Sequence, residues 1–145
     1  MTNEIWKEVP SRKGIRVSSI GRIVFPSRFA NMPNGGRREY KPKPTYGYIT
    51  KASKKARHEY MGIYNKHYGN VKVHRLVCEA FYGPPPFEKA VVIHKDEDAT
   101  NNKIENIKWG TQKENLNAPG FIAYCKSRTG KDSPSYKGKL NRKAK

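Results

Sequence analysis

The first half of the chain alternates apolar and polar residues over short stretches, a pattern that predicts β-strands. Residues 5–10 and 15–24 show this alternation, broken by Gly14 and Gly21, so we expect two short strands in a small N-terminal antiparallel sheet. The side chains that we expect in the core of this unit are Trp6, Val17 and Ile23.

A second pair of strands is predicted at residues 46–50 and 58–64, with the basic segment 51–57 as the turn between them. The tyrosines of these strands could cover a sheet face or stack on nucleic-acid bases, and we favour the sheet. The preceding segment, residues 26–45, holds four prolines, two adjacent glycines and several cationic residues. That composition predicts a long basic loop.

Helical spacing replaces the alternation further along the chain. Residues 71–74 alternate as a strand, and the apolar residues of 75–81 recur at helical spacing, so we expect a strand and then a helix. Gly83 and the three prolines after it should end this helix. His74 at the junction could bind a ligand, but a histidine at the head of a core helix is more often structural, and we favour that role.

Residues 90–94 are a short, strongly apolar stretch that predicts a strand ending at His94, and an acidic turn follows at once. Thr111 and Glu114 have the spacing of a capping box, which predicts a helix start with Asn115 in its first turn. Because an imidazole titrates near pH 6.5, at about the physiological range, His94 can be neutral and remove a proton from water.

These elements together predict an α+β protein in three parts. We expect a basic, β-rich region in residues 1–70, a compact core in 71–117 and an extended basic tail in 118–145 that is flexible without a partner. With 145 residues and a mean hydropathy of -0.92, the chain can bury only a small core.

Other classes of protein find little support in the composition. No apolar run approaches the roughly 20 residues that cross a bilayer, and the start of the chain lacks the pattern of a signal peptide. The two cysteines form no Cys-x-x-Cys pair, which argues against a structural zinc site and fits a reducing compartment. We therefore expect a cytoplasmic protein, without a membrane partner.

Basic residues are concentrated toward the two ends of the chain. The formal net charge is +18, and residues 1–70 hold 15 Lys and Arg against 4 Asp and Glu. Residues 71–117 hold 7 against 7, and residues 118–145 hold 8 against 1. Cationic arms around a neutral middle are typical of a protein that holds a polyanion, so we expect a nucleic acid as the partner.

The middle of the chain carries polar residues at a specific spacing: His94, Asn106 and Asn115, preceded by the block Val-His-Arg-Leu-Val at residues 73–77. Over residues 71–117 this pattern resembles the ββα-metal core of HNH endonucleases, in the subgroup of phage homing endonucleases. Residues 4–25, with Trp-Lys-Glu-Val-Pro and Val-Ser-Ser-Ile-Gly-Arg-Ile, are similar to the N-terminal module of that group.

The resemblance implies a role for each of these polar residues. His94 would be the general base, Asn106 would hold the loop that carries it, and Asn115 would bind a single Mg²⁺ or Mn²⁺ ion at the scissile phosphate. Products would carry 5′-phosphate and 3′-hydroxyl ends, as in the family.

One position departs from the family pattern. The family usually has Asp directly before the catalytic His, where this chain has Ile93. Because Ile offers no oxygen to a hard cation, metal affinity should fall. Asp96 or Asp98 could supply a substitute carboxylate, and we favour Asp96, since residues two apart on a strand share a face and Asp96 would share that of His94.

The predicted partner is double-stranded DNA. The tail segment 129–140 could contact DNA along a groove or only solubilise the chain, and we favour contact. The predicted DNA-binding residues are Arg28, Arg37, Arg38, Lys54, Lys55, Arg57, Lys131, Lys137 and Lys139.

We therefore expect a monomeric, metal-dependent HNH endonuclease that nicks or cuts double-stranded DNA, in the host cytoplasm if it is phage-encoded. The alternative is an HNH-derived DNA-binding module that lost its activity with the change to Ile93. A third hypothesis, an RNA-binding or ribosome-associated protein, rests on charge alone.

Overall fold

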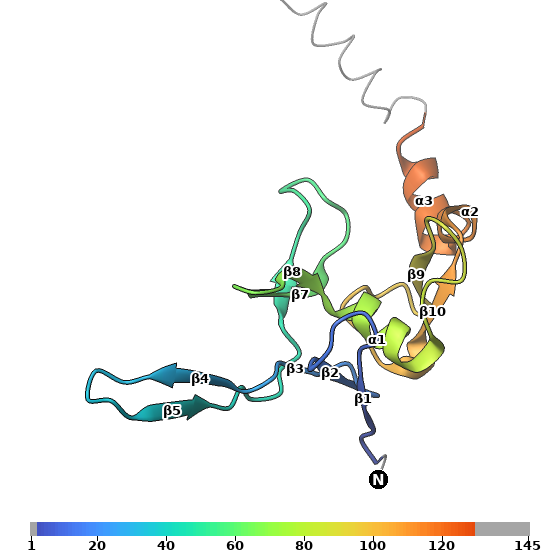
Figure 1. Cartoon of the computed structure of the whole chain (residues 1–145). Coiled ribbons are helices and arrows are strands. Elements are labelled where there is room, and N and C mark those ends of the chain that lie inside the picture. The colour runs from blue at the N-terminus through green and yellow to red at the C-terminus, as the bar shows by residue number, and fades with distance from the viewer. Residues whose placement is uncertain (1–2, 130–145) are drawn as a thin grey trace, which may run out of the picture.

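The computed structural model describes residues 3–129, which form several small antiparallel sheets and three α-helices, as Figure 1 shows. The expected α+β class is confirmed. In chain order the elements are β1 (Trp6–Glu8), β2 (Arg16–Ser18), β3 (Ile23–Val24), β4 (Arg28–Asn31), β5 (Arg37–Tyr40), β6 (Tyr48–Thr50), β7 (Tyr60–Asn65), β8 (Gly69–Lys72), α1 (Val73–Tyr82), β9 (Val91–His94), the 3₁₀ turn η1 (Ile104–Asn106), β10 (Ile107–Gly110), α2 (Gln112–Leu116) and α3 (Pro119–Ser127).

The N-terminal sheet has three strands in the order β1-β2-β3, one more than expected. Gly21, with φ of +88°, lies in the turn that divides the second expected strand into β2 and β3. Val17 and Ile23 are fully buried, as expected. The expectation for Trp6 is wrong: its side chain is half-buried and lies under the guanidinium of Arg22, 5.7 Å from the ring centre.

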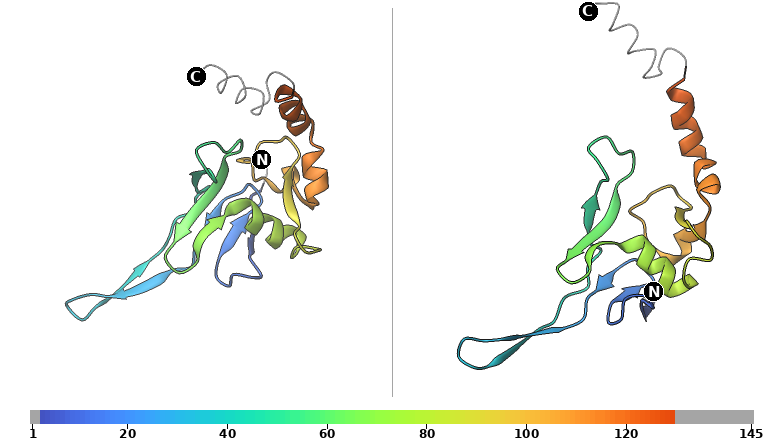
Figure 2. Two further views of the ribbon diagram at one scale, coloured as in Figure 1. Left: turned by 90° about the horizontal axis from the view of Figure 1, so that it is seen from above. Right: turned by 45° about the horizontal axis from the view of Figure 1, so that its top comes forward.

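Residues 26–45 contain a projecting β-hairpin instead of the expected loop, as Figure 2 shows in both views. Its strands β4 and β5 pair from Arg28 opposite Tyr40 to Asn31 opposite Arg37. All four prolines lie outside the two strands, so none interrupts the ladder of hydrogen bonds. Nearly every residue of β4 and β5 is exposed. The hairpin therefore lacks the apolar alternation by which a half-buried strand is recognised.

The second sheet has the order β6-β7-β8 and includes both strands expected at residues 46–50 and 58–64. α1 follows β8 directly and begins at Val73, two residues before the expected helix, so His74 belongs to its first turn. The helix ends at Tyr82 and is capped by Gly83, which has φ of +87° and donates its N–H to the carbonyl of Glu79 at 3.0 Å.

One hydrophobic core joins the N-terminal sheet to the rest of the molecule, and Figure 1 shows α1 between that sheet and the β9–β10 hairpin. Ser11 fixes the contact from the surface, since its N–H and hydroxyl donate to the Glu79 carboxylate at 2.8 and 2.9 Å. No helix within residues 3–129 is long and apolar enough to cross a bilayer. The fully or largely buried apolar side chains are Val9, Ile15, Val17, Ile23, Phe25, Val71, Val73, Leu76, Val77, Cys78 and Ile107.

The expectation of an extended tail from residue 118 is wrong for residues 119–127, which form α3. Pro119 at the helix start suits the first turn, where its missing N–H would have no helical partner. The Glu97 carboxylate accepts the N–H of Gly120 at 2.9 and 3.1 Å and so caps the helix from outside the expected tail. The predicted DNA contacts Lys131, Lys137 and Lys139 lie outside the described residues.

Candidate active site

His94 stands at the end of a two-stranded hairpin. β9 and β10 are antiparallel, with His94 opposite Ile107 and Ile93 opposite Lys108. Ile107 is fully buried in the core and anchors the hairpin there. The predicted strand therefore exists, and it presents His94 where the loop of residues 95–103 begins.

Asn106 holds this loop through three hydrogen bonds. Its Oδ1 accepts the N–H of Asp96 at 3.1 Å, and its Nδ2 donates to Asp96 Oδ1 at 2.8 Å and to the Asn101 carbonyl at 2.9 Å. The Asn106 side chain is buried, 8% exposed. The chain directly after His94 is therefore held to the η1 turn that precedes β10.

Asp96 is occupied within the loop. Besides the bond from Asn106, its Oδ1 accepts the N–H of Asp98 at 2.9 Å and its Oδ2 accepts Nδ2 of Asn101 at 2.7 Å. Burial acts to raise the pKa of Asp96, but the hydrogen bonds from Asn101 and Asn106 outweigh it and hold the pKa below its usual value. β9 ends at His94, so the strand alternation used to place Asp96 beside His94 does not apply. The geometry gives Asp96 a role in the loop rather than the predicted role at a metal ion.

Asn102 sets the orientation of the His94 ring. Its Oδ1 lies 3.0 Å from His94 Nε2, and with the amide oxygen toward the ring, Nε2 carries the proton and Nδ1 the lone pair. Burial lowers the pKa of His94, and this effect exceeds the opposing effects of Asn102, Asp96 and Asp98. His94 is therefore neutral at pH 7, the state in which an imidazole accepts a proton.

A second histidine lies behind His94. The rings of His74 and His94 meet edge to face with their centres 5.6 Å apart. His74 is 6% exposed, and burial is the main cause that lowers its pKa to about 3. Within the described part of the chain its Nδ1 has no hydrogen-bond partner. His74 is therefore a neutral packing group against the His94 ring, which agrees with the structural role favoured from the sequence.

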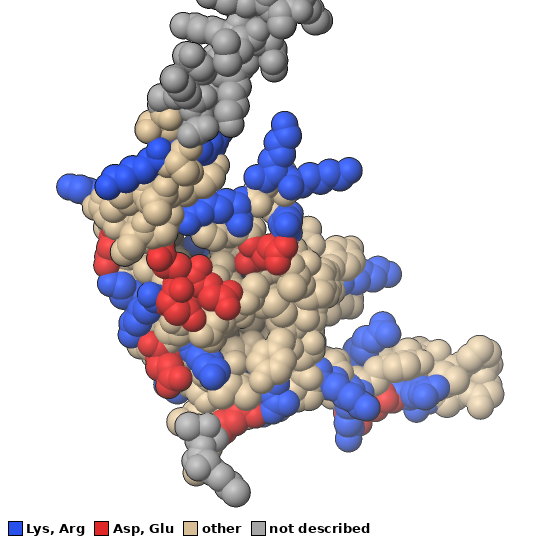
Figure 3. Space-filling model, turned by 180° about the vertical axis from the view of Figure 1, so that it is seen from behind, with Lys and Arg blue, Asp and Glu red and all other residues tan. Residues whose placement is uncertain are grey.

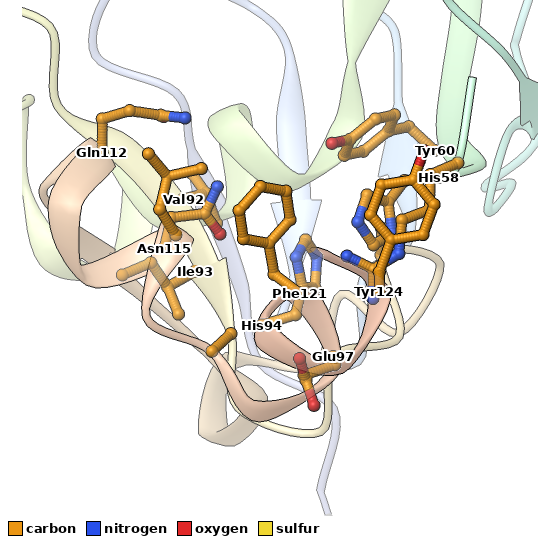
Figure 4. A pocket seen from close by; sticks show the side chains of 14 residues that line it. His58, Tyr60, Val92, Ile93, His94, Glu97, Gln112, Asn115, Phe121 and Tyr124 are labelled. Carbon is orange, nitrogen blue, oxygen red and sulfur yellow. The ribbon is translucent and has the colours of Figure 1, made fainter. Parts of the chain in front are cut away.

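The His94 ring lines a pocket of about 290 Å³ between three parts of the chain. Figure 4 shows side chains from the β9 strand, from the segment that leads into β7, and from α2 and α3 around this space. Asn115 lines the same pocket, so the structure brings it together with His94. Other side chains that line the pocket include Arg57, His58, Glu97, Phe121 and Tyr124.

A divalent ion beside His94 would need oxygen donors, because Mg²⁺ and Mn²⁺ prefer anionic oxygen. Asn115 offers a neutral amide, whereas the hydrocarbon side chain of Ile93 lies against Gly110. Glu97 is the carboxylate among the described lining residues, and both its oxygens accept the N–H of Gly120. Within residues 3–129 no three His, Cys, Asp or Glu side chains are grouped to hold an ion. This donor set does not fit Mg²⁺ or Mn²⁺.

α3 covers one side of the pocket. Phe121 and Tyr124 line it, and the guanidinium of Arg57 lies over both rings, 5.7 and 5.0 Å from their centres. Glu97 holds the start of the same helix. Arg57 was predicted to bind DNA from the basic turn between two strands, and the structure places it at the pocket, with its guanidinium over two aromatic faces.

The other predicted DNA-binding residues lie on two projections. Arg28, Arg37 and Arg38 are exposed on the β4–β5 hairpin, where Figure 3 shows Lys and Arg side chains along the projecting arm. Arg28 and Arg38 both lie over the ring of Tyr40, at 4.9 and 5.2 Å from its centre. Lys54 and Lys55 are exposed and lie in the turn between β6 and β7. These cations thus lie on two separate projections, the β4–β5 hairpin and the turn between β6 and β7.

Sequence reasoning missed several members of the pocket. His58, Phe121 and Tyr124 lie far from His94 along the chain and carry no spacing signal. Asn102, which bonds the His94 ring, was not among the predicted site residues either. The signal that could have indicated His58 as a site residue is its position directly after the basic turn of residues 51–57.

Comparison with known proteins gives a match over the part of the chain that contains His94. Residues 71–117 match the family model described as HNH endonuclease. Among solved structures, a chain of the HNH homing endonuclease I-HmuI, described for DNA binding and cleavage, is 25% identical with a TM-score of 0.47. The match covers 85% of this chain and 66% of that one, slightly less than two thirds. A search of curated proteins gave no match. The match to the family model thus covers the part of the chain that carries His94, Asn106 and Asn115.

Proposed function

We propose that this chain is an endonuclease that hydrolyses phosphodiester bonds of double-stranded DNA. The observation that carries the proposal is the neutral His94 ring, oriented by Asn102 on a loop that Asn106 fixes, at the wall of a pocket. A ring held in this way can remove a proton from a water molecule as that water attacks phosphorus.

The groups around His94 support the other parts of this reaction. Arg57 and the Asn115 amide line the pocket and can donate hydrogen bonds to the non-bridging phosphate oxygens. Asn102 and Asn106 act as positioning residues, because they bond the ring and its loop. Attack by water with loss of the 3′ oxygen leaves a 5′-phosphate and a 3′-hydroxyl.

HNH endonucleases use a divalent metal ion, and the resemblance implies Mg²⁺ or Mn²⁺. Because the donors around His94 do not fit such an ion, no step of the proposed mechanism uses one. The cleavage rate is therefore compared with and without each ion.

The cationic arms support binding to DNA. If each of the six predicted residues that the structure describes replaces one counterion, the slope of log Kobs against log salt should be about -5. A single cation removed from an arm should reduce that slope by about 1. The proposals that the chain is a monomer, a phage homing endonuclease and a protein of the host cytoplasm rest on the sequence alone.

The test compares supercoiled plasmid cleavage by the wild type, His94→Ala and His67→Ala, with Mg²⁺, with Mn²⁺ and with a chelator. His67 is an exposed histidine outside the pocket and serves as the matched control. We expect the wild type and His67→Ala to nick or linearise the plasmid, and His94→Ala to bind DNA equally but leave it intact.

The alternative, a DNA-binding module without activity, is favoured by Ile93, which removes the usual carboxylate beside the catalytic His. It predicts a different outcome in the same experiment. The wild type would bind DNA with a steep salt dependence and leave the plasmid supercoiled under all three conditions.

A further inference from the structure

A second titratable imidazole, that of His58, lines the same pocket as His94. His58 lies just before β7, in the wall that also holds Arg57 and Tyr60, whereas Asn115 lines the pocket from α2. Figure 4 shows both imidazoles among the side chains around this space. The pocket therefore holds two groups that can move protons, and the proposed mechanism uses only one of them.

A series of ring contacts connects these two histidines. The ring centres are 6.4 Å apart for His58 and Tyr60, 5.2 Å for Tyr60 and His74, and 5.6 Å for His74 and His94. The two imidazoles are also within electrostatic reach of each other: burial lowers the pKa of His94, and the charge of His58 lowers it further. His74 thus lies between Tyr60 and His94 in this series of rings.

A neighbouring hollow is lined by His58 together with charges of both signs: Glu59, Glu97 and Asp98, and Lys51 and Arg57. Burial lowers the pKa of His94, which suits that ring to accept a proton. General acid and base catalysis also needs a group that donates one, and His58 is the other imidazole among the lining residues of the pocket.

The departing 3′ oxygen also needs a partner. In HNH enzymes the metal ion stabilises the negative charge that develops there, but the donors around His94 do not fit such an ion in this chain. A proton delivered to the same oxygen would remove that charge. In an in-line displacement the attacking and leaving oxygens are on opposite sides of phosphorus, so the acid must stand across the pocket from the base.

Building on the proposed endonuclease function, we propose that His58 is the general acid of this site and protonates the leaving 3′ oxygen. A water molecule attacks phosphorus and gives its proton to His94 Nδ1, while the bond between phosphorus and the 3′ oxygen breaks. The electron pair of that bond stays on the 3′ oxygen, which takes the proton of His58. The products are a 5′-phosphate and a 3′-hydroxyl, and proton exchange with solvent restores both rings.

The test compares the wild type, His58→Ala and the control His67→Ala on two DNA duplexes in the same buffer. One duplex is natural, and the other carries a bridging sulfur in place of the 3′ oxygen at the cleavage position. Sulfur leaves without a proton, so the second duplex needs no general acid. We expect His58→Ala to cleave the natural duplex about 100-fold more slowly than the wild type, or slower still, and the sulfur duplex at nearly the wild-type rate.

Each other outcome counts against the proposal. Equal rates of His58→Ala and wild type on the natural duplex would show that His58 donates no proton, while the endonuclease function would stand. An equal loss of rate on both duplexes would make His58 a structural group only. A wild type that cleaves neither duplex would refute the endonuclease function, and the role of His58 with it.

Discussion

Replacement of Asn106 by Ala should destabilise the protein strongly, because its side chain holds the loop after His94. The variant loses bonds to the Asp96 N–H, the Asp96 carboxylate and the Asn101 carbonyl. The two bonds to backbone groups are worth about 1 kcal/mol each, and the bond to the exposed carboxylate is worth about 1.5 kcal/mol. The expected loss is therefore about 3 to 4 kcal/mol, a large part of the roughly 5 to 15 kcal/mol of a small protein.

Urea unfolding measures this loss. With a slope of about 1 to 3 kcal/mol per molar urea, the midpoint for Asn106→Ala should fall by about 1 M or more, and the slope itself should stay the same. Asn117→Ala is the matched control, since Asn117 is an exposed asparagine at the end of α2, and its midpoint should move little.

Asn106→Asp tests the reasoning further at nearly the same side-chain volume. The new carboxylate can still accept the N–H of Asp96, but it cannot donate and it faces the Asp96 carboxylate. At pH 7 this variant should be at least as unstable as Asn106→Ala. A loss below about 1 kcal/mol for Asn106→Ala would show that the three bonds do not hold the loop.

Three further outcomes follow from the contacts around His94. Gly21→Ala should lower the free energy of unfolding in urea by about 1 to 3 kcal/mol, because Gly21 has φ of +88° and a Cβ there would lie 2.9 Å from the Asn102 Cβ. Since Asn102 bonds the His94 ring, the NMR signals of that ring should shift as well. Unchanged signals would contradict this. His74 has a pKa of about 3 in the folded protein, lower than in the unfolded chain, so the unfolded chain binds more protons between about pH 6.5 and 3 and stability should fall by about 1.4 kcal/mol per unit as the pH drops. His74→Leu should lack this slope between pH 7 and 4.5, and equal slopes would refute the assignment. Ile93→Asp should bind Mn²⁺ at least about tenfold more tightly in calorimetry, because it restores an anionic oxygen, and unchanged affinity would show that position 93 does not face the ion.

The parts of the fold that the sequence predicted are those determined by nearby residues. The strand that ends at His94 and the helix start at Thr111 are encoded within a few residues each, and the structure contains both, with the Thr111 hydroxyl accepting the N–H of Glu114 at 3.1 Å. The resemblance to the HNH motif likewise implied that Asn106 holds the loop after His94, and in the structure Asn106 ends η1 and bonds to Asp96.

The parts that the sequence did not predict depend on contacts between distant segments. The β4–β5 hairpin buries no face, so its strands carry no apolar period, and the four prolines around them indicated a loop. α3 is held by the Glu97 carboxylate at its start and by Arg57 over its aromatic rings, neither of which is close to it in sequence. His58 becomes a member of the pocket only when the segment before β7 folds against the space that residues of β9, α2 and α3 also line.

Cleavage of an end-labelled DNA duplex in water enriched in ¹⁸O tests the central claim most directly, that His94 activates water for attack on phosphorus. Mass spectrometry of the products should find one ¹⁸O in the new 5′-phosphate and none in the 3′-hydroxyl, and His94→Ala should give no product while His67→Ala gives the wild-type result. Label in the 3′-hydroxyl, or the same yield of labelled product from His94→Ala, would contradict the account.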